Sequence, residues 1–187
     1  MKKSWLLSLG ICCLLFVGGV WSHPATKSYI LGITSFYSDL GGKSCKTTQH
    51  DEESGSITQI CSGVGGYKLE VSEGDLRQTV TIIAPNRKKY PLDLTSNVSG
   101  GFSSVGQKAE WRVKKQGKQV VPVGLIIRFN ASEDPADSSK VTSYLTVSKI
   151  TARAACLTNI IKPGPQQNEQ AQQAADIAAT QPCFKRS

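Results

Sequence analysis

The chain has 187 residues, with 22 Lys and Arg against 14 Asp and Glu and a formal net charge of +8. This length suits one domain with a real core and is too short for two comfortable ones. A basic chain attracts anionic partners, but Tyr90 is the only aromatic residue beside a basic run, which argues against a nucleic-acid-binding protein.

The first 22 residues have the pattern of a secretory signal peptide. Lys2 and Lys3 precede an apolar run at residues 6–20, and Val20-Trp21-Ser22 follows as a small-residue cleavage site. The run is shorter than the roughly 20 residues that cross a bilayer, so we expect cleavage after Ser22 and no transmembrane span. Loss of the two lysines leaves a charge of +6 on a periplasmic or secreted protein, and the short leader looks bacterial.

Four cysteines remain after cleavage, and an even number in an exported chain predicts two disulfides. Of the three possible connectivities, pairing of neighbours is the simplest, with bonds Cys45–Cys61 and Cys156–Cys183. A zinc site is the alternative, but no two of these cysteines have CxxC spacing, and only His23 and His50 could assist. We predict no metal and no cofactor.

The stretch CSGVGGYKLEVSEGDLRQ, Cys61 to Gln78, has three glycines before an alternating segment. A phosphate-binding loop needs Gly-Lys-Ser or Gly-Lys-Thr before a helix, whereas these glycines precede a strand. We therefore interpret them as a sharp corner beside a disulfide. The alternation that follows predicts a hairpin with a turn at 72–75 and with Val71 opposite Leu76, which would also place Glu70 opposite Arg77.

The next segments extend the β pattern. A short strand is expected near 90–94, a Gly- and Ser-rich loop at 96–108, and a second hairpin around Gly117. A three-residue loop at 116–118 would set Trp111 opposite Val123, and a two-residue loop would set it opposite Pro122. We expect the longer loop, because it places Trp111 on the same face of the sheet as Leu125, Ile127 and Phe129. The almost wholly apolar run at 120–129 is typical of a strand buried on both faces.

The remaining elements are a solvated loop at 131–140, strands at 141–150 and near 156–161, and a helix at about 166–180 after two prolines. Its alanines at helical spacing form a stripe that would lie close against a sheet, namely Ala171, Ala174, Ala175 and Ala178. The fold class is therefore α+β and mostly β: an antiparallel sheet or small sandwich with one C-terminal helix, stapled by disulfides. Residues 45–187 form a single domain, and segment 23–44 has room for one strand.

Two short charged stretches are candidate binding residues, whereas nothing predicts a catalytic residue. In each stretch an acid and an arginine lie two residues apart on one strand face. Surface ion pairs are one interpretation. The other is that the charged residues meet and form a polar recognition site, because arginine donates in pairs to carboxylates and phosphates. The residues are Asp75 and Arg77, and Glu110, Trp111 and Arg112.

A basic patch is a third feature of the sequence. Its side chains lie in turns and outer strand positions of the two hairpins and would attract an anionic envelope polymer. They are Arg87, Lys88, Lys89, Lys114, Lys115 and Lys118.

The combination of CxGxxGY at 61–67, GDLRQ at 74–78, EWR at 110–112 and a late cysteine pair resembles a family of small exported bacterial proteins without an assigned activity. The resemblance implies export and paired cysteines and supplies no catalytic or ligand residue. We expect a non-enzymatic exported protein that binds an envelope polymer or another exported protein. An envelope hydrolase or its inhibitor, and a structural subunit of an envelope assembly, are the alternatives.

Overall fold

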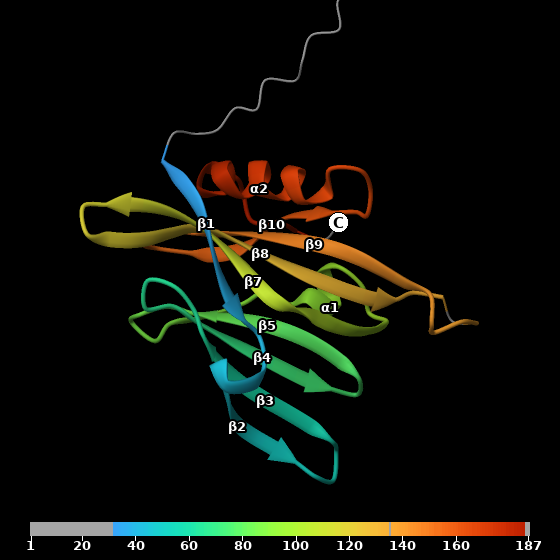
Figure 1. Cartoon of the computed structure of the whole chain (residues 1–187). Helices are drawn as coiled ribbons and strands as arrows, with labels where there is room; N and C mark the ends of the chain where they lie inside the picture. Colours follow the sequence, from blue (N-terminus) through green and yellow to red (C-terminus); the bar gives the residue numbers. More distant parts are fainter. Residues whose placement is uncertain (1–31, 135, 186–187) are drawn as a thin grey trace, which may run out of the picture.

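The computed structural model describes residues 32–134 and 136–185, and in this part of the chain strands predominate (Figure 1). The predicted leader at residues 1–22 and His23 lie outside the described residues. The strands are β1 (Ile33–Asp39), β2 (Cys45–Asp51), β3 (Ser56–Ser62), β4 (Lys68–Gly74), β5 (Arg77–Ile83), β6 (Lys89–Pro91), β7 (Phe102–Gln116), β8 (Gln119–Ser132), β9 (Val141–Ile150) and β10 (Ala155–Ile161). The helical elements are η1 (Gly42–Ser44), α1 (Leu94–Asn97), α2 (Gln167–Ile177) and η2 (Ala178–Thr180).

The strands form one hydrogen-bonded ladder in the order β10-β9-β8-β7-β5-β4-β3-β2, with β1 added to β7 and β6 added to β5. All pairings are antiparallel except that of β5 with β7, which consists of a single parallel bridge between Arg77 and Ser103. Because so little holds β5 to β7, the ladder bends there, and its two halves face each other across a core (Figure 1). This is the mostly β architecture with one C-terminal helix that the sequence predicts.

The core between the two halves contains the largest buried side chains. Leu69 and Ile82 come from the β4–β5 half, and Trp111, Leu125 and Phe129 come from the β7–β8 half. Burying such side chains supplies about 1.5–3 kcal/mol each. This core therefore holds the two halves together.

Helix α2 covers the outer face of β8 and β9 (Figure 1). Ala171, Ala175 and Ala178 are fully buried there against Ile126 and Val147. The alanine stripe is confirmed, and so is the burial of the middle of β8 on both faces, since Leu125, Ile127 and Phe129 face the main core and Ile126 faces the helix.

Both predicted disulfides are present. Cys45 and Cys61 lie directly opposite each other in β2 and β3, and Cys156 joins β10 to Cys183 in the C-terminal segment. The C-terminal segment is also held by a hydrogen bond of 2.7 Å from the Phe184 amide to the Leu157 carbonyl.

The glycine-rich stretch after Cys61 is a structural corner. Gly65 and Gly66 have φ values of +62° and +80°, which favour glycine. A Cβ atom on Gly63 would lie 2.6 Å from the Trp111 ring. The absence of side chains therefore lets this corner lie tightly against the core.

The first hairpin differs in register from the prediction. Val71 lies opposite Val80 rather than Leu76, and Glu70 lies opposite Thr81 rather than Arg77. The reason is the turn, which contains only Asp75 and Leu76, both with positive φ as in a type I′ turn. Because the side-chain period of a strand is two, a shift of four residues leaves the buried face unchanged.

The second hairpin has a two-residue loop, Gly117-Lys118, so the predicted three-residue loop is wrong. Val113 lies opposite Pro122, and a bulge between Arg112 and Val113 then brings Trp111 opposite Leu125. The bulge thus places Trp111 on the same face as Leu125, as the longer loop would have done.

The loop predicted at 96–108 is too long, because α1 ends at Asn97 and β7 begins at Phe102, which leaves only residues 98–101 between them. The Gly- and Ser-rich residues of β7 pair with the end of β8, which extends to Ser132. A Cβ atom on Gly106 would lie 2.9 Å from the Arg128 Cβ. Here glycine permits close packing of strands and does not mark a loop.

Candidate functional site

Arg77 lies at the bend of the sheet, where β5 meets β7, and 34% of its side chain is exposed. It forms an ion pair with Asp75, and its Nε donates a hydrogen bond of 2.8 Å to the Gly100 carbonyl. Its guanidinium carbon lies 5.1 Å from the centre of the Phe102 ring. The arginine is therefore fixed by contacts on three sides and still reaches solvent.

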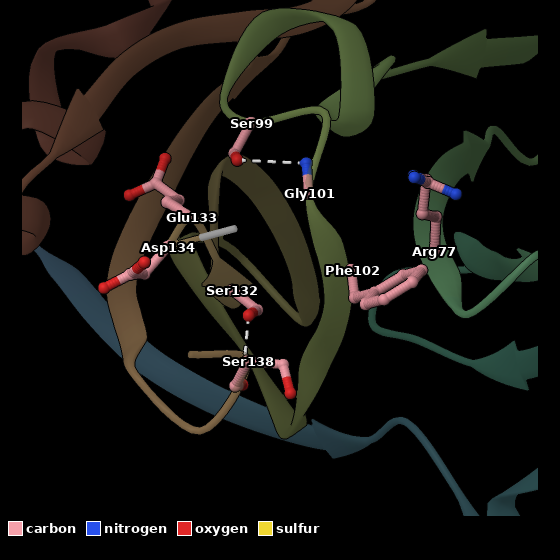
Figure 2. Close-up of a pocket in the computed structure, with 8 residues that line it drawn as sticks. All are labelled: Arg77, Ser99, Gly101, Phe102, Ser132, Glu133, Asp134 and Ser138. Carbon is pink, nitrogen blue, oxygen red and sulfur yellow. Dashed lines mark hydrogen bonds between the residues drawn. The ribbon is translucent and has the colours of Figure 1, made fainter. Parts of the chain in front are cut away.

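A hollow of about 430 Å³ adjoins Arg77, between the start of β7 and the end of β8 (Figure 2). Phe102 and Arg77 lie on one side, and Glu133 and Asp134 lie on the other. Figure 2 shows both carboxylates directed away from the guanidinium. The opposite charges therefore do not converge on one point in this hollow.

The two carboxylates of the hollow are stabilised in their ionised forms. Burial tends to raise the pKa of Glu133, but hydrogen bonds from Tyr144, Thr142 and Ser99 outweigh it and hold the pKa below its ordinary value of 4.5. A 2.8 Å hydrogen bond from the Lys140 ammonium likewise lowers the pKa of Asp134. Neither group holds a proton at neutral pH, so neither is suited to act as a general acid.

Three exposed apolar residues lie at the same end of the molecule as Arg77. Leu76 is 64% exposed, Phe102 is 44% exposed and Val141 is 56% exposed. Phe102 of β7 and Val141 of β9 both pair with Ser132 of β8, which lies between these two strands. The Leu76 carbonyl accepts a hydrogen bond of 2.9 Å from the Ser103 amide of β7. Residues from three separate hairpins thus meet at one end of the molecule.

Arg112, by contrast, lies beneath α2, with only 7% of its side chain exposed. Its Nε and Nη2 donate to the two carboxylate oxygens of Asp176 at 2.6 and 3.0 Å. Burial tends to lower the pKa of the guanidinium, but the hydrogen bond with Asp176 and its charge, helped by Glu110, raise it. Arg112 is therefore a buried, paired cation.

Glu110 belongs to the same buried network. Its Oε1 accepts hydrogen bonds from Ser35 of β1 and from Gln172 of α2, the latter at 2.9 Å, and lies 3.7 Å from the Arg112 Nη1. The network joins β1, β7 and α2. Asp176 was missed in the sequence, although its spacing of four residues from Gln172 places both on one helix face.

Trp111 points into the main core and is fully buried, and its indole Nε1 donates to the Ser38 hydroxyl at 2.8 Å. The two acid–arginine pairs are not brought together. Ser103, which lies opposite Arg77, and Glu110 pair with Ala131 and Ile126 of β8, which are five positions apart, a distance of about 17 Å along that strand. A recognition site shared by all four charged residues is therefore not formed.

The six predicted basic residues lie at one end of the strands. Arg87 and Lys88 are in the turn between β5 and β6, and Lys89 begins β6. The three lysines at 114, 115 and 118 are at the tip of the β7–β8 hairpin. The Gly65-Gly66 corner packs between these two parts: a Cβ atom on Gly65 would lie 2.7 Å from Pro122, and one on Gly66 would lie 3.4 Å from Pro85. All six side chains are exposed.

Two further basic residues, which no local pattern in the sequence singles out, belong to the same end. Lys68 begins β4 beside the glycine corner, and the Arg153 carbonyl accepts a hydrogen bond of 3.3 Å from the Tyr90 hydroxyl. Glu70 is the nearby carboxylate, and it is already paired with Lys89 at 2.6 Å. We call this surface the basic end: Lys68, Arg87, Lys88, Lys89, Lys114, Lys115, Lys118 and Arg153.

The opposite end of the strands is acidic. Its turns and loops lie where β2 meets β3, where β4 meets β5, and where β8 leads to β9. Arg77 and Lys140 are the cations in these three connections, and each is paired with an aspartate. The carboxylates there are Asp51, Glu52, Glu53, Glu73, Asp75, Glu133, Asp134 and Asp137.

Within residues 32–134 and 136–185, no cluster of three or more His, Cys, Asp or Glu side chains is arranged to hold a metal ion. His50 is exposed in β2. No helix in the described part of the chain is both long and apolar enough to cross a bilayer.

The chain matches no protein-family model, no curated protein and no solved structure. The resemblance to small exported bacterial proteins therefore stays a prediction.

Proposed function

We propose that this protein is an exported, non-enzymatic binding protein of the bacterial envelope that holds an anionic polymer on its basic end. The observation that carries the proposal is the gathering of eight exposed cations from separate turns and strand ends, with Glu70 as a nearby carboxylate that is already neutralised by Lys89. Clustered charge of one sign attracts a polyanion much more strongly than the same charges dispersed over the surface.

The arrangement suits a polymer better than a small anion. The basic side chains extend from the β5–β6 turn to the tip of the β7–β8 hairpin, and they are exposed and do not enclose a cavity. A repeating anion can bind several of them at once and release counterions at each. Two disulfides support the exported location, because they persist in oxidising compartments.

The alternatives have less support. A hydrolase would need a proton-donating acid, and the carboxylates of the hollow at Arg77 are both stabilised in their ionised forms. A structural subunit would be favoured by an exposed apolar edge strand. The edge strand β2 exposes Lys, Thr, Gln, His and Asp, and no residue of β10, at the other end of the ladder, is exposed. In β1, which pairs with β7 alone, the exposed Phe36 and Tyr37 lie among polar residues.

The test is binding to dextran sulfate and to linear polyphosphate, measured at several salt concentrations, with uncharged dextran as the blank. The variant Lys88→Ser, Lys115→Ser, Lys118→Ser should bind at least about tenfold more weakly. The dependence of log K on log salt should also become shallower, by about one unit for each lysine that no longer binds the polymer.

A matched variant removes three exposed lysines elsewhere, Lys43→Ser, Lys46→Ser and Lys162→Ser, and should bind within about twofold of the parent. Equal reductions in affinity in the two triple variants would show that net charge alone drives binding. Absence of binding to both polyanions would also refute the proposal.

A further inference from the structure

The acidic end carries an apolar surface that the proposed polymer site does not use. We call it the end patch, and it consists of Leu76, Arg77, Phe102 and Val141. The three apolar members are exposed by 44–64%, and their backbones are joined through Ser132 and the Ser103 amide. A group of exposed apolar residues at one end of a small protein is typical of an interaction site.

The conformation and exposure of Leu76 do not contribute to the stability of the fold. It lies at the second position of a type I′ turn with φ of +56°, a conformation that glycine or asparagine adopts at little cost and a leucine does not. Its side chain is also the most exposed of the large apolar residues in the described chain. A strained backbone that presents an apolar side chain to solvent indicates a function outside the fold.

Arg77 and Phe102 give the end patch a rigid centre. The guanidinium lies over the aromatic ring at 5.1 Å and is held by Asp75 and the Gly100 carbonyl, so little side-chain freedom is left to lose on binding. Aromatic residues and arginine are the types enriched at the centres of protein–protein interfaces.

The charges around the end patch decide what kind of partner it accepts. Asp75, Glu133 and Asp134 border it. Of the cations nearby, Arg77 and Lys140 are already paired with aspartates, and Lys162 acts on Glu133 through its charge. This rim repels an anionic lipid surface and attracts positive charge. We propose that the end patch docks a second protein through a segment in which basic residues flank an apolar anchor.

The experiment is a selection of random dodecapeptides on the disulfide-bonded protein, with the variant Leu76→Gly, Phe102→Ser used for counter-selection. Selected peptides should be rich in Lys and Arg around Leu, Ile, Phe or Trp, and they should bind the double variant at least about tenfold more weakly. Amide resonances of residues 76, 77, 102 and 141 should shift when such a peptide is added.

Three controls make the result decisive. Leu76→Gly alone should unfold at the same or a higher denaturant concentration, because glycine relieves the positive φ, so weaker peptide binding cannot come from unfolding. Ile177→Ser removes an apolar residue of similar exposure, 47%, on α2 and should leave binding unchanged. The basic-end triple variant should bind the peptides as the parent does, which separates this proposal from the polymer site.

Failure to select any peptide that distinguishes the double variant would overturn the proposal, as would enrichment of acidic peptides. Vesicles of phosphatidylethanolamine and phosphatidylglycerol in a 3:1 ratio provide the other arm. Binding to them that is abolished in the double variant would assign the end patch to lipid instead.

Discussion

Asp75-Leu76-Arg77 and Glu110-Trp111-Arg112 have the same order of side chains, an acid, an apolar residue and an arginine, yet they lie in opposite environments. Arg77 is at a partly exposed bend, and Leu76 projects into solvent. Arg112 is buried beneath α2 with Asp176, and Trp111 fills the main core. The comparison shows that the same local pattern can stabilise a fold or remain on its surface, depending on what packs over its strand.

The largest expected difference concerns the central residue of each triplet. Trp111→Ala should lower the free energy of unfolding by about 4 kcal/mol, because it leaves a cavity between the two halves of the sheet. Leu76→Ala should change it by less than about 0.5 kcal/mol. Denaturant titration of both variants measures the difference, and similar destabilisation by both would show that the hairpin tip is buried in solution.

The acidic partners of the two arginines form the second test. Asp176→Ala leaves the buried Arg112 uncompensated and should cost about 3 kcal/mol. Asp75→Ala removes an exposed partner of Arg77 and should cost less than about 1 kcal/mol. Thermal or denaturant unfolding gives both values. A small effect of Asp176→Ala would mean that water reaches Arg112 and that α2 is only loosely attached.

Two glycines extend the comparison to the ends of the strands. Gly65 and Gly55 have φ values of +62° and +68°, so alanine should cost a backbone penalty of about 1 kcal/mol at either position. Only at Gly65 does the added Cβ meet other atoms, at 2.7 Å from Pro122 and 2.8 Å from the Val120 carbonyl.

Gly65→Ala should therefore be less stable than Gly55→Ala by about a further 2 kcal/mol in the free energy of unfolding. Equal stabilities of the two alanine variants would contradict the close packing of the glycine corner against β8.

The smallest effect is expected from Glu133, beside the end patch. Its pKa is depressed in the folded state, so its ionised form stabilises folding above the unfolded pKa, and this contribution is lost as pH falls through the folded value. Glu133→Gln should cost less than about 1 kcal/mol at pH 7, because the carboxylate is exposed, and nothing near pH 2. Unfolding curves of parent and variant across this range provide the check, and a constant difference would exclude an ionised carboxylate as the cause.

Much of the fold could be predicted from local pattern. The number and order of the cysteines predicted both disulfides. The apolar run at 120–129 predicted a strand buried on both faces, and the spaced alanines predicted a helix that lies on the sheet. The hairpin registers could not be predicted, because they depend on turn geometry that Asp75-Leu76 does not signal and on a bulge beside Arg112.

By itself, the sequence determined the class of the fold, its two covalent staples and the number of cations in the turns, because these depend on residue spacing and composition. Only the tertiary structure decided that Asp176 neutralises Arg112 while Arg77 stays at the surface, and that cations from separate turns share one end. The physical reason is that burial and the clustering of charges depend on which elements pack together. Local sequence patterns do not reveal contacts between residues that are tens of positions apart.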